Sequence, residues 1–215
     1  MQTVRLSFKD IELRASRAHL CGMGAGNEVS PSCMKSLFLL GPPEPGFWPT
    51  FTASPEYLDG HGDPLDRWSS CVVGALARDL GGEAFFPFGP PPYQPFFKWA
   101  QLSGRAHQSP VGLLVHDEAG LLVSYRGAVG FSYEISTPKA GPSPCDHCSD
   151  QPCLTACPVG ALMGDMYDVP GCKSDLTRQG NDCLSRGCAV RRACPVSREY
   201  GRDEAQSSFH MKAFQ

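Results

Sequence analysis

The sequence predicts an α+β chain in two parts, an N-terminal α+β domain at residues 1–139 and a C-terminal domain at residues 140–215. Three observations lead to this prediction. Before residue 139 the chain carries one strong amphipathic helical pattern and several short apolar segments of strand length. After residue 139 large apolar residues are few, and eight of the eleven cysteines lie there. The second part is therefore expected to be organised around its thiols.

In the first part, we expect a short helix at Asp10–Leu20 and a short buried strand at Ser36–Leu40, which leads into a proline-rich loop. Later in the chain, two β-branched and apolar segments flank a turn-forming Asp-Glu-Ala-Gly sequence. This pattern predicts a hairpin whose strands are Val111–His116 and Leu121–Arg126.

The strongest helical pattern covers Leu65–Leu80. Asp63 suits the N-cap and Pro64 the first helical position, and a pair of glycines follows the last apolar residue. One apolar stripe is expected to face the core. It consists of Leu65, Trp68, Val72, Leu76 and Leu80.

The cysteines of the second part form two runs, each closed by a Cys-Pro pair, with a single cysteine between the runs. They are Cys145, Cys148, Cys153, Cys157, Cys172, Cys183, Cys188 and Cys194. The first run follows the bacterial ferredoxin pattern, in which four thiolates hold each [4Fe–4S] cube, except that one gap is four residues long instead of two. The sequence therefore predicts a ferredoxin-like C-terminal domain with two [4Fe–4S] clusters.

The fourth cysteine of a ferredoxin run usually ligates the other cluster of the pair. By this rule, Cys157 ligates the cluster held mainly by the second run, and Cys194 ligates the cluster held mainly by the first run. The predicted ligands of the first cluster are then Cys145, Cys148, Cys153 and Cys194. Those of the second cluster are Cys157, Cys172, Cys183 and Cys188.

Two other roles for these cysteines stay open. A disulfide framework needs an oxidising compartment, and the first ten residues lack the charged and apolar regions of a secretory signal. Zinc is the stronger alternative, because His147 lies inside the Cys145–Cys148 knuckle. Zinc sites usually pair two similar knuckles, whereas these spacings are unequal. We therefore rank a zinc-stabilised interaction protein below the clusters and expect His147 to be a loop residue near one of them.

Residues 141–200 resemble the two-cluster module of epoxyqueuosine reductase and of corrinoid-dependent reductive dehalogenases. The resemblance rests on Cys157-Pro158-Val-Gly-Ala161, on Cys172 between a glycine and a lysine, and on Cys194-Pro195, and all eight cysteines map one to one. In that family the module passes electrons to a base-off cobalamin held by a nitroreductase-like domain. In the first part, Ser109–Val115 and Tyr125–Gly127 resemble uncharacterised bacterial ferredoxin-like proteins.

The resemblance implies an iron–sulfur electron-transfer protein or a reductase component. A corrinoid-dependent or flavin-dependent reductase is the alternative, with cobalamin or flavin bound by the first domain. The family's catalytic acid matches no residue of this chain, so whether the protein is itself an oxidoreductase stays open.

Charge and hydropathy bear on partners and location. The net charge of −3 and the isoelectric point near 6.0 do not favour a nucleic-acid-binding protein, and no apolar run approaches the length of a membrane span. We expect a cytoplasmic protein. The arginines around the second cysteine run either form a solvated face or steer an acidic electron-transfer partner such as a flavodoxin or ferredoxin. They are Arg186, Arg191, Arg192 and Arg198.

The remaining candidate residues of the first part are expected to be structural. Cys21, Cys33 and Cys71 lack partners at ligand spacing, and the glycine-rich segment Cys21–Gly26 is a weak match to a nucleotide-binding loop. The segment Phe85–Trp99, dense in aromatic and proline residues, either lines a planar ligand's pocket or fills the core, which we favour. Three isolated histidines are expected to be ordinary polar residues. They are His61, His107 and His116.

Overall fold

The computed structural model describes residues 5–27, 34–164 and 166–215, and the chain divides into two compact units. Unit 1 comprises Met1–Pro43, Pro49–Arg105 and Ser124–Ala140. Unit 2 comprises Glu44–Trp48, Ala106–Val123 and Gly141–Gln215. The last boundary between the two units lies at residues 140/141, one residue after the boundary expected at 139/140. Two earlier segments, Glu44–Trp48 and Ala106–Val123, also belong to unit 2. Helices and strands occur together, which confirms the α+β class.

Unit 1 is built on a four-stranded sheet in the order β1-β2-β6-β3, in which every neighbouring pair is antiparallel. Its strands are β1 (Cys21–Gly26), β2 (Ser36–Gly41), β3 (Glu83–Phe85) and β6 (Gly127–Phe131). All residues of β2 and β6 are buried, so the strand expected at Ser36–Leu40 is confirmed. The glycine-rich segment is the strand β1 and not a nucleotide-binding loop. Gly22 is needed there because a Cβ atom would lie 2.7 Å from the Phe38 ring.

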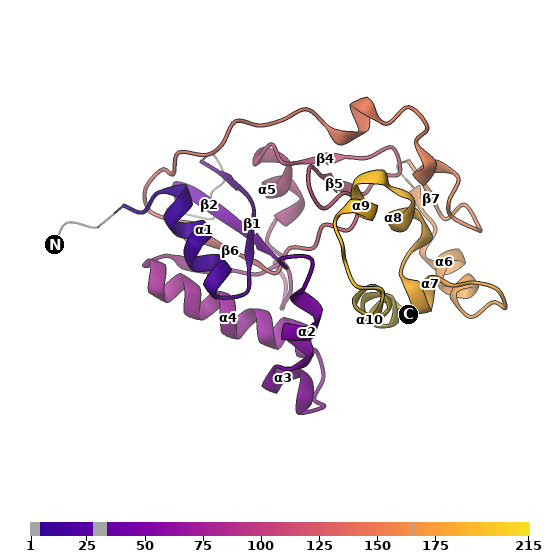
Figure 1. The fold of residues 1–215 in the computed structure, drawn as a ribbon, viewed down its shortest axis with the longest axis horizontal. Coiled ribbons are helices and arrows are strands. Elements are labelled where there is room, and N and C mark those ends of the chain that lie inside the picture. The colour runs from indigo at the N-terminus through magenta and orange to yellow at the C-terminus, as the bar shows by residue number, and fades with distance from the viewer. Residues whose placement is uncertain (1–4, 28–33, 165) are drawn as a thin grey trace. The chain divides into compact units, whose positions relative to one another are not determined.

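Two helices, α1 and α4, contact each other and the sheet of unit 1 (Figure 1). The helices outside the last 75 residues are α1 (Phe8–Arg17), α2 (Phe47–Thr52), α3 (Pro55–Leu58), α4 (Pro64–Leu80) and α5 (Phe96–Leu102). The helix expected at Asp10–Leu20 begins two residues earlier, because Ser7 and Asp10 form a capping box. It also ends earlier, at Arg17, and His19 adopts a left-handed conformation with φ 55°.

The helix α4 agrees closely with its sequence pattern. Pro64 is its first residue, Asp63 is its N-cap, and Gly81 ends it with φ 68°. The Asp63 side chain makes no capping hydrogen bond. Val73 is buried and Val72 is only half-buried, so the apolar stripe differs at that one position.

The hairpin expected from Val111–His116 and Leu121–Arg126 is wrong. In unit 2, β5 (Leu114–His116) pairs with β4 (Ala106–Gln108), which precedes it in the chain. His116 and Gly120 form only an isolated bridge across the turn, so the chain reverses too tightly there for two long strands. Leu121–Arg126 lies outside the strands, and β6 begins at Gly127.

The rest of unit 2 consists of short elements joined by loops (Figure 1). They are η1 (Pro144–His147), η2 (Pro152–Leu154), β7 (Leu162–Met163), β8 (Met166–Tyr167), α6 (Val169–Leu176), α7 (Cys183–Arg186), α8 (Ala189–Ala193), α9 (Pro195–Glu199) and α10 (Glu204–Phe214). These elements do not by themselves show a ferredoxin-like iron–sulfur domain, and that part of the fold class stays a prediction. No helix within the described ranges is long and apolar enough to cross a membrane.

Candidate metal centres

Four of the eight cysteines of unit 2 surround one cavity of about 250 Å³. They are Cys145, Cys148, Cys153 and Cys194, the set expected for the first cluster. The remaining lining is mostly apolar and includes Pro144, Val115, Leu121 and Val196. His147, the last residue of η1, also lines this cavity. A thiol from the last cysteine run therefore joins three thiols of the first run, although it lies 41 to 49 positions after them in the chain.

Short turns present the three thiols of the first run. The turn η1 carries Cys145 and is capped at its C-terminal end by Cys148, and the Ser143 hydroxyl accepts a hydrogen bond from the Cys145 N–H at 3.2 Å. Gln151 then adopts a left-handed conformation with φ 39°, which turns the chain into η2 and its buried Cys153. Close spacing of the cysteines therefore produces a loop that bends around a common point.

The fourth thiol, Cys194, is positioned by the segment at Gly120–Leu121. The Leu121 N–H donates to the Ser197 hydroxyl at 2.8 Å, and the Arg191 guanidinium donates to the Leu121 carbonyl. Cys194 lies between Arg191 and Ser197 in the chain, so both flanking helices, α8 and α9, are tied to the same segment. Apolar packing supports this arrangement. The buried residues of this core are Val111, Val115, Leu121, Cys153, Leu162, Val190 and Cys194.

Gly120 is required for the close approach of α9. It has φ 57°, and a Cβ atom at this position would lie 2.5 Å from the Ser197 backbone nitrogen. Sequence reasoning assigned Gly120 only to a turn. The contact with Ser197 has no local signal, because 76 positions separate Leu121 from Ser197.

We predict that Gly120→Ala lowers the unfolding free energy of unit 2 by about 1–3 kcal/mol, because a methyl group must push α9 and Cys194 outward. Gly180→Ala is the matched control, since Gly180 also has a positive φ of 89° but nothing within 4 Å of its Cβ position. The measurement is amide hydrogen exchange in unit 2. Equal losses of protection in the two variants would contradict the role of this close approach.

The other four thiols form a second neighbourhood in unit 2. Burial is the main cause that raises the pKa of Cys172, and repulsion from Cys188 and Cys157 raises it further. Burial likewise raises the pKa of Cys183, with Cys188 as its neighbouring thiol. This set is the one expected for the second cluster. None of the eight cysteines of the two sets forms a disulfide.

In the first set too, the thiols that raise the pKa of a cysteine belong to its own set. Burial raises the pKa of Cys145, and the thiols that raise it further are Cys153, Cys194 and Cys148. Burial also raises the pKa of Cys153, with Cys194 and Cys148 as the repelling neighbours. For Cys145, Cys153, Cys172 and Cys183, the neighbouring thiols that raise the pKa thus belong to the same set of four.

Hydrogen bonds also reach sulfur atoms of the second set, among them one from Ala161 and one from Tyr167. The Ala161 N–H donates to the Cys157 Sγ at 3.2 Å, and the Tyr167 hydroxyl lies 3.8 Å from the Cys172 Sγ. Burial, followed by the contact with Cys172, raises the pKa of Tyr167 above its ordinary value, so the hydroxyl keeps its proton. Sequence reasoning did not single out Tyr167, because an isolated tyrosine five residues before a cysteine matches no ligand pattern.

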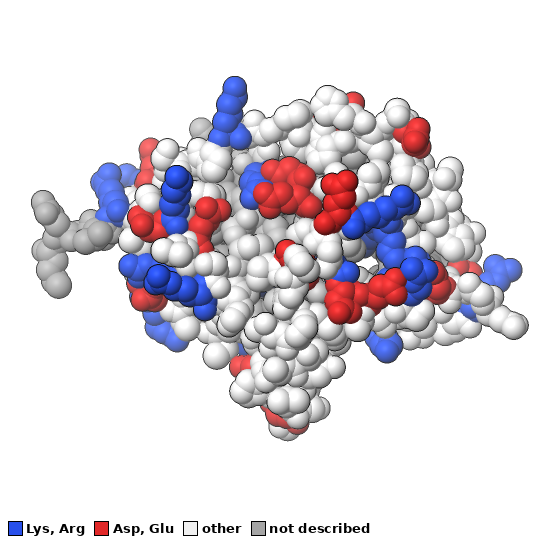
Figure 2. All heavy atoms as spheres, viewed as in Figure 1, with Lys and Arg blue, Asp and Glu red and all other residues white. Residues whose placement is uncertain are grey.

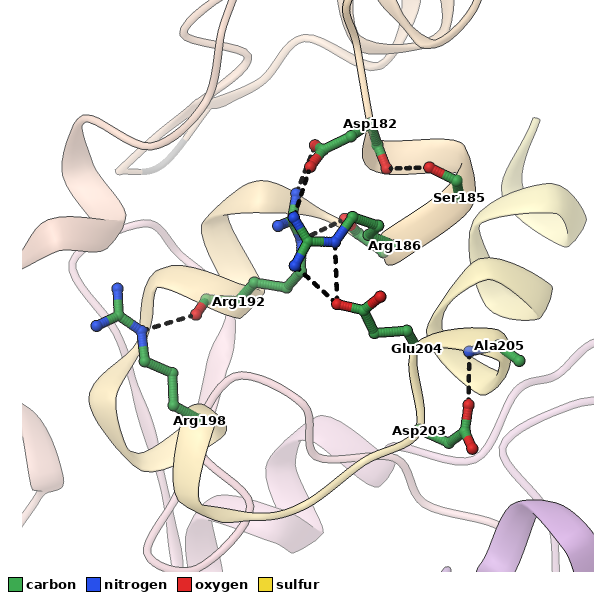
Figure 3. Close-up of polar contacts among 9 residues, drawn as sticks. Asp182, Ser185, Arg186, Arg192, Arg198, Asp203, Glu204 and Ala205 are labelled. Carbon is green, nitrogen blue, oxygen red and sulfur yellow. Dashed lines mark hydrogen bonds and ion pairs between the residues drawn. The ribbon is translucent and has the colours of Figure 1, made fainter.

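The arginines of the last cysteine run are largely engaged within unit 2 (Figure 3). Arg186 pairs with Glu204 at 2.8 Å and with Asp182 at 3.3 Å, and Arg192 pairs with the same Asp182 at 2.5 Å. Arg198 donates to the Arg192 carbonyl at 3.3 Å. In Figure 2 basic and acidic side chains are likewise interspersed on the visible face. The expected surplus of positive charge around these cysteines is therefore balanced in part by acids from outside the run.

The described cysteines of unit 1 are not members of either set. Cys21 is in β1, where its Sγ lies 3.2 Å from the Pro42 carbonyl oxygen, and Cys71 is exposed on α4. Cys33 lies outside the described residues. The exposure of Cys71 does not suit the structural role expected of it.

The aromatic segment of unit 1 divides between core and surface. Phe96 and Phe85 pack against Trp99, with ring centroids 4.9 and 6.0 Å apart, and all three side chains are buried. Tyr93 and Phe97 are exposed. These contacts favour the core role for the buried part of Phe85–Trp99.

Of the three histidines considered, His61 belongs to unit 1, and His107 and His116 lie on the paired strands β4 and β5 of unit 2. His61 is exposed, and His107 lies on β4. His116 is fully buried, and its Nδ1 accepts hydrogen bonds from the backbone N–H groups of Glu118 and Ala119. His116 therefore stabilises the turn that precedes Leu121, in line with the structural role expected of it.

Within residues 5–27, 34–164 and 166–215, no three His, Cys, Asp or Glu side chains lie close enough together to hold a single metal ion. A [4Fe–4S] cube is coordinated at four separate iron corners, so its thiolates are spread around a cavity and do not converge on one point. Comparison with protein-family models, with curated proteins and with solved structures gives no significant match.

Proposed function

We propose that unit 2 is a ferredoxin-like module that binds two [4Fe–4S] clusters and transfers electrons. The observation that carries the proposal is the cavity lined by four thiols from two distant cysteine runs. Four soft thiolate donors around a single mostly apolar cavity suit an iron–sulfur cube. The first cluster is assigned to the thiols of that cavity. The second is assigned to Cys157, Cys172, Cys183 and Cys188.

The chain's own residues would hold and shield these groups, and the bound clusters would supply one-electron chemistry. The apolar side chains around the first cavity would shield its thiolates in part from water, since Cys153 and Cys194 are buried and Cys145 and Cys148 are half-buried. At the second set, the Ala161 N–H stabilises negative charge on Cys157. Because burial raises the pKa of several of these thiols when no metal is bound, loading the sites would release their protons.

The proposed role is that of an electron carrier or reductase component, working with a protein that donates or accepts electrons. Reduced thiolate ligands favour the cytoplasm as its location. An acidic partner such as a flavodoxin or ferredoxin would meet a surface on which Arg186 and Arg192 are already paired with Asp182 and Glu204. Charge attraction by these arginines is therefore weaker than their number suggests.

The corrinoid-dependent or flavin-dependent reductase rests on the sequence resemblance alone. The aromatic residues that would line a planar cofactor's pocket include Phe85, Phe96 and Trp99, which pack against one another in the core of unit 1. We therefore keep electron transfer as the proposed function of unit 2 and assign no cofactor to unit 1.

We predict that anaerobically purified or reconstituted protein contains about eight iron and about eight acid-labile sulfide per chain, since each of two cubes carries four of each. Metal and sulfide analysis measures this content directly. Cys71→Ala is the matched control and should keep the full content, because Cys71 lies on α4 of unit 1. Zinc bound without sulfide would contradict the proposal and support the zinc-stabilised interaction protein.

A further inference from the structure

Tyr167 is fixed in place by the backbone around it. It belongs to β8, where it pairs with Leu162 of β7, and the next residue, Asp168, donates its N–H to the Ala161 carbonyl at 2.8 Å. The same Ala161 donates its own N–H to the Cys157 Sγ. Tyr167 is therefore held by a hairpin that is itself bonded to one thiol of the second set.

The end of the chain supports the tyrosine ring. Phe214, the last residue of α10, stacks on Tyr167 with ring centroids 6.0 Å apart and an interplanar angle of 10°. Lys173 lies with its Nζ 5.2 Å from the Phe214 ring centroid and donates to the Gln215 carbonyl at 3.1 Å. Lys173 directly follows Cys172 in the chain. Its contacts with Phe214 and Gln215 therefore hold the ring that stacks on Tyr167 close to Cys172, which the Tyr167 hydroxyl contacts.

The direction of the hydrogen bond follows from the chemistry of the sulfur. A thiolate that binds metal has no proton and accepts hydrogen bonds only, whereas a phenol can donate. The Tyr167 hydroxyl, 3.8 Å from the Cys172 Sγ, is therefore the donor whenever Cys172 is a thiolate.

We propose that Tyr167 is a positioning residue that raises the reduction potential of the second cluster through its hydrogen bond to Cys172. This inference rests on the proposed function. When a one-electron reductant reduces the cluster, negative charge on the ligand sulfurs increases, and a donor at the sulfur stabilises the reduced state more than the oxidised one. The electron enters the cluster, no bond is broken, and the proton stays on the tyrosine oxygen.

Tyr167→Phe tests the proposal, because it removes only the hydroxyl and keeps the ring that stacks on Phe214. We expect the ratio of reduced to oxidised second cluster, at a fixed ambient potential, to fall by about threefold to tenfold, and tenfold corresponds to about 59 mV for a one-electron couple. Anaerobic titration with dithionite, followed by electron paramagnetic resonance, measures this ratio. The first cluster serves as the internal reference and should keep its potential.

Tyr93→Phe is the matched control, since it makes the same chemical change at an exposed position of unit 1. It should leave both potentials unchanged. Iron and sulfide are measured on every protein first. Wild-type protein without clusters would defeat the proposed function itself. A Tyr167→Phe protein with full iron content and an unchanged reduction potential of the second cluster would overturn only the proposed role of Tyr167. A Tyr167→Phe protein that fails to assemble the second cluster would also overturn that role, because the hydroxyl is assigned no part in ligation.

Discussion

Removal of iron by a chelator under reducing conditions is expected to unfold unit 2 and to leave unit 1 folded. The apolar core of unit 2 is small and includes the thiols themselves, since Cys153 and Cys194 are buried in it. Once the iron is lost, the protein loses the bonds that hold four thiols around each site. For small metal-dependent domains this contribution equals most of the folding free energy, here about 5 kcal/mol or more.

Amide hydrogen exchange followed by mass spectrometry checks this prediction on the full chain. Unit 1 supplies the internal control, because its core does not use the eight thiols. Its large fully buried side chains include Phe38, Phe131, Leu20, Leu37, Leu39 and Leu40. Protection should be lost in α6–α10 and kept in α4 and β2. An iron-free protein whose C-terminal amides stay protected would show that apolar packing alone holds unit 2 together.

The crossed ligand sets predict for which pairs of cysteine substitutions the losses of iron add up. Cys194→Ala and Cys157→Ala should each reduce the iron content from about eight to about four per chain, because each removes a ligand of a different cube. The difference between crossed and local pairing appears in double variants. Cys194→Ala with Cys148→Ala should keep about four iron, since both residues belong to the first set.

Cys194→Ala combined with Cys183→Ala should instead lose nearly all iron, because one ligand of each cube is then missing. Local pairing, in which each run closes its own cube, predicts the opposite result for the two double variants. Iron and sulfide analysis therefore decides the pairing without an assignment of spectra. Cys71→Ala in combination with Cys194→Ala is the control and should keep about four iron, the same as Cys194→Ala alone.

Local patterns predicted the elements that depend on neighbouring residues. The helix α4 follows from its proline at the first position, its apolar period and its terminal glycine. The strand β2 follows from a short apolar run. The expected hairpin failed because Val115 and its neighbours pair with Ala106–Gln108, and an apolar strand pattern does not specify its partner.

By itself, the sequence determined which thiols are candidate ligands and that they fall into runs closed by proline, because spacing within a loop is a local property. Only the tertiary structure decided what surrounds them. It brought Gly120 and Leu121 to α9, paired Arg186 with Glu204, and placed the Tyr167 hydroxyl against Cys172. These contacts join residues through close backbone approach, charge pairing and a hydroxyl–sulfur hydrogen bond, and such geometry has no periodic or spaced signal along the chain.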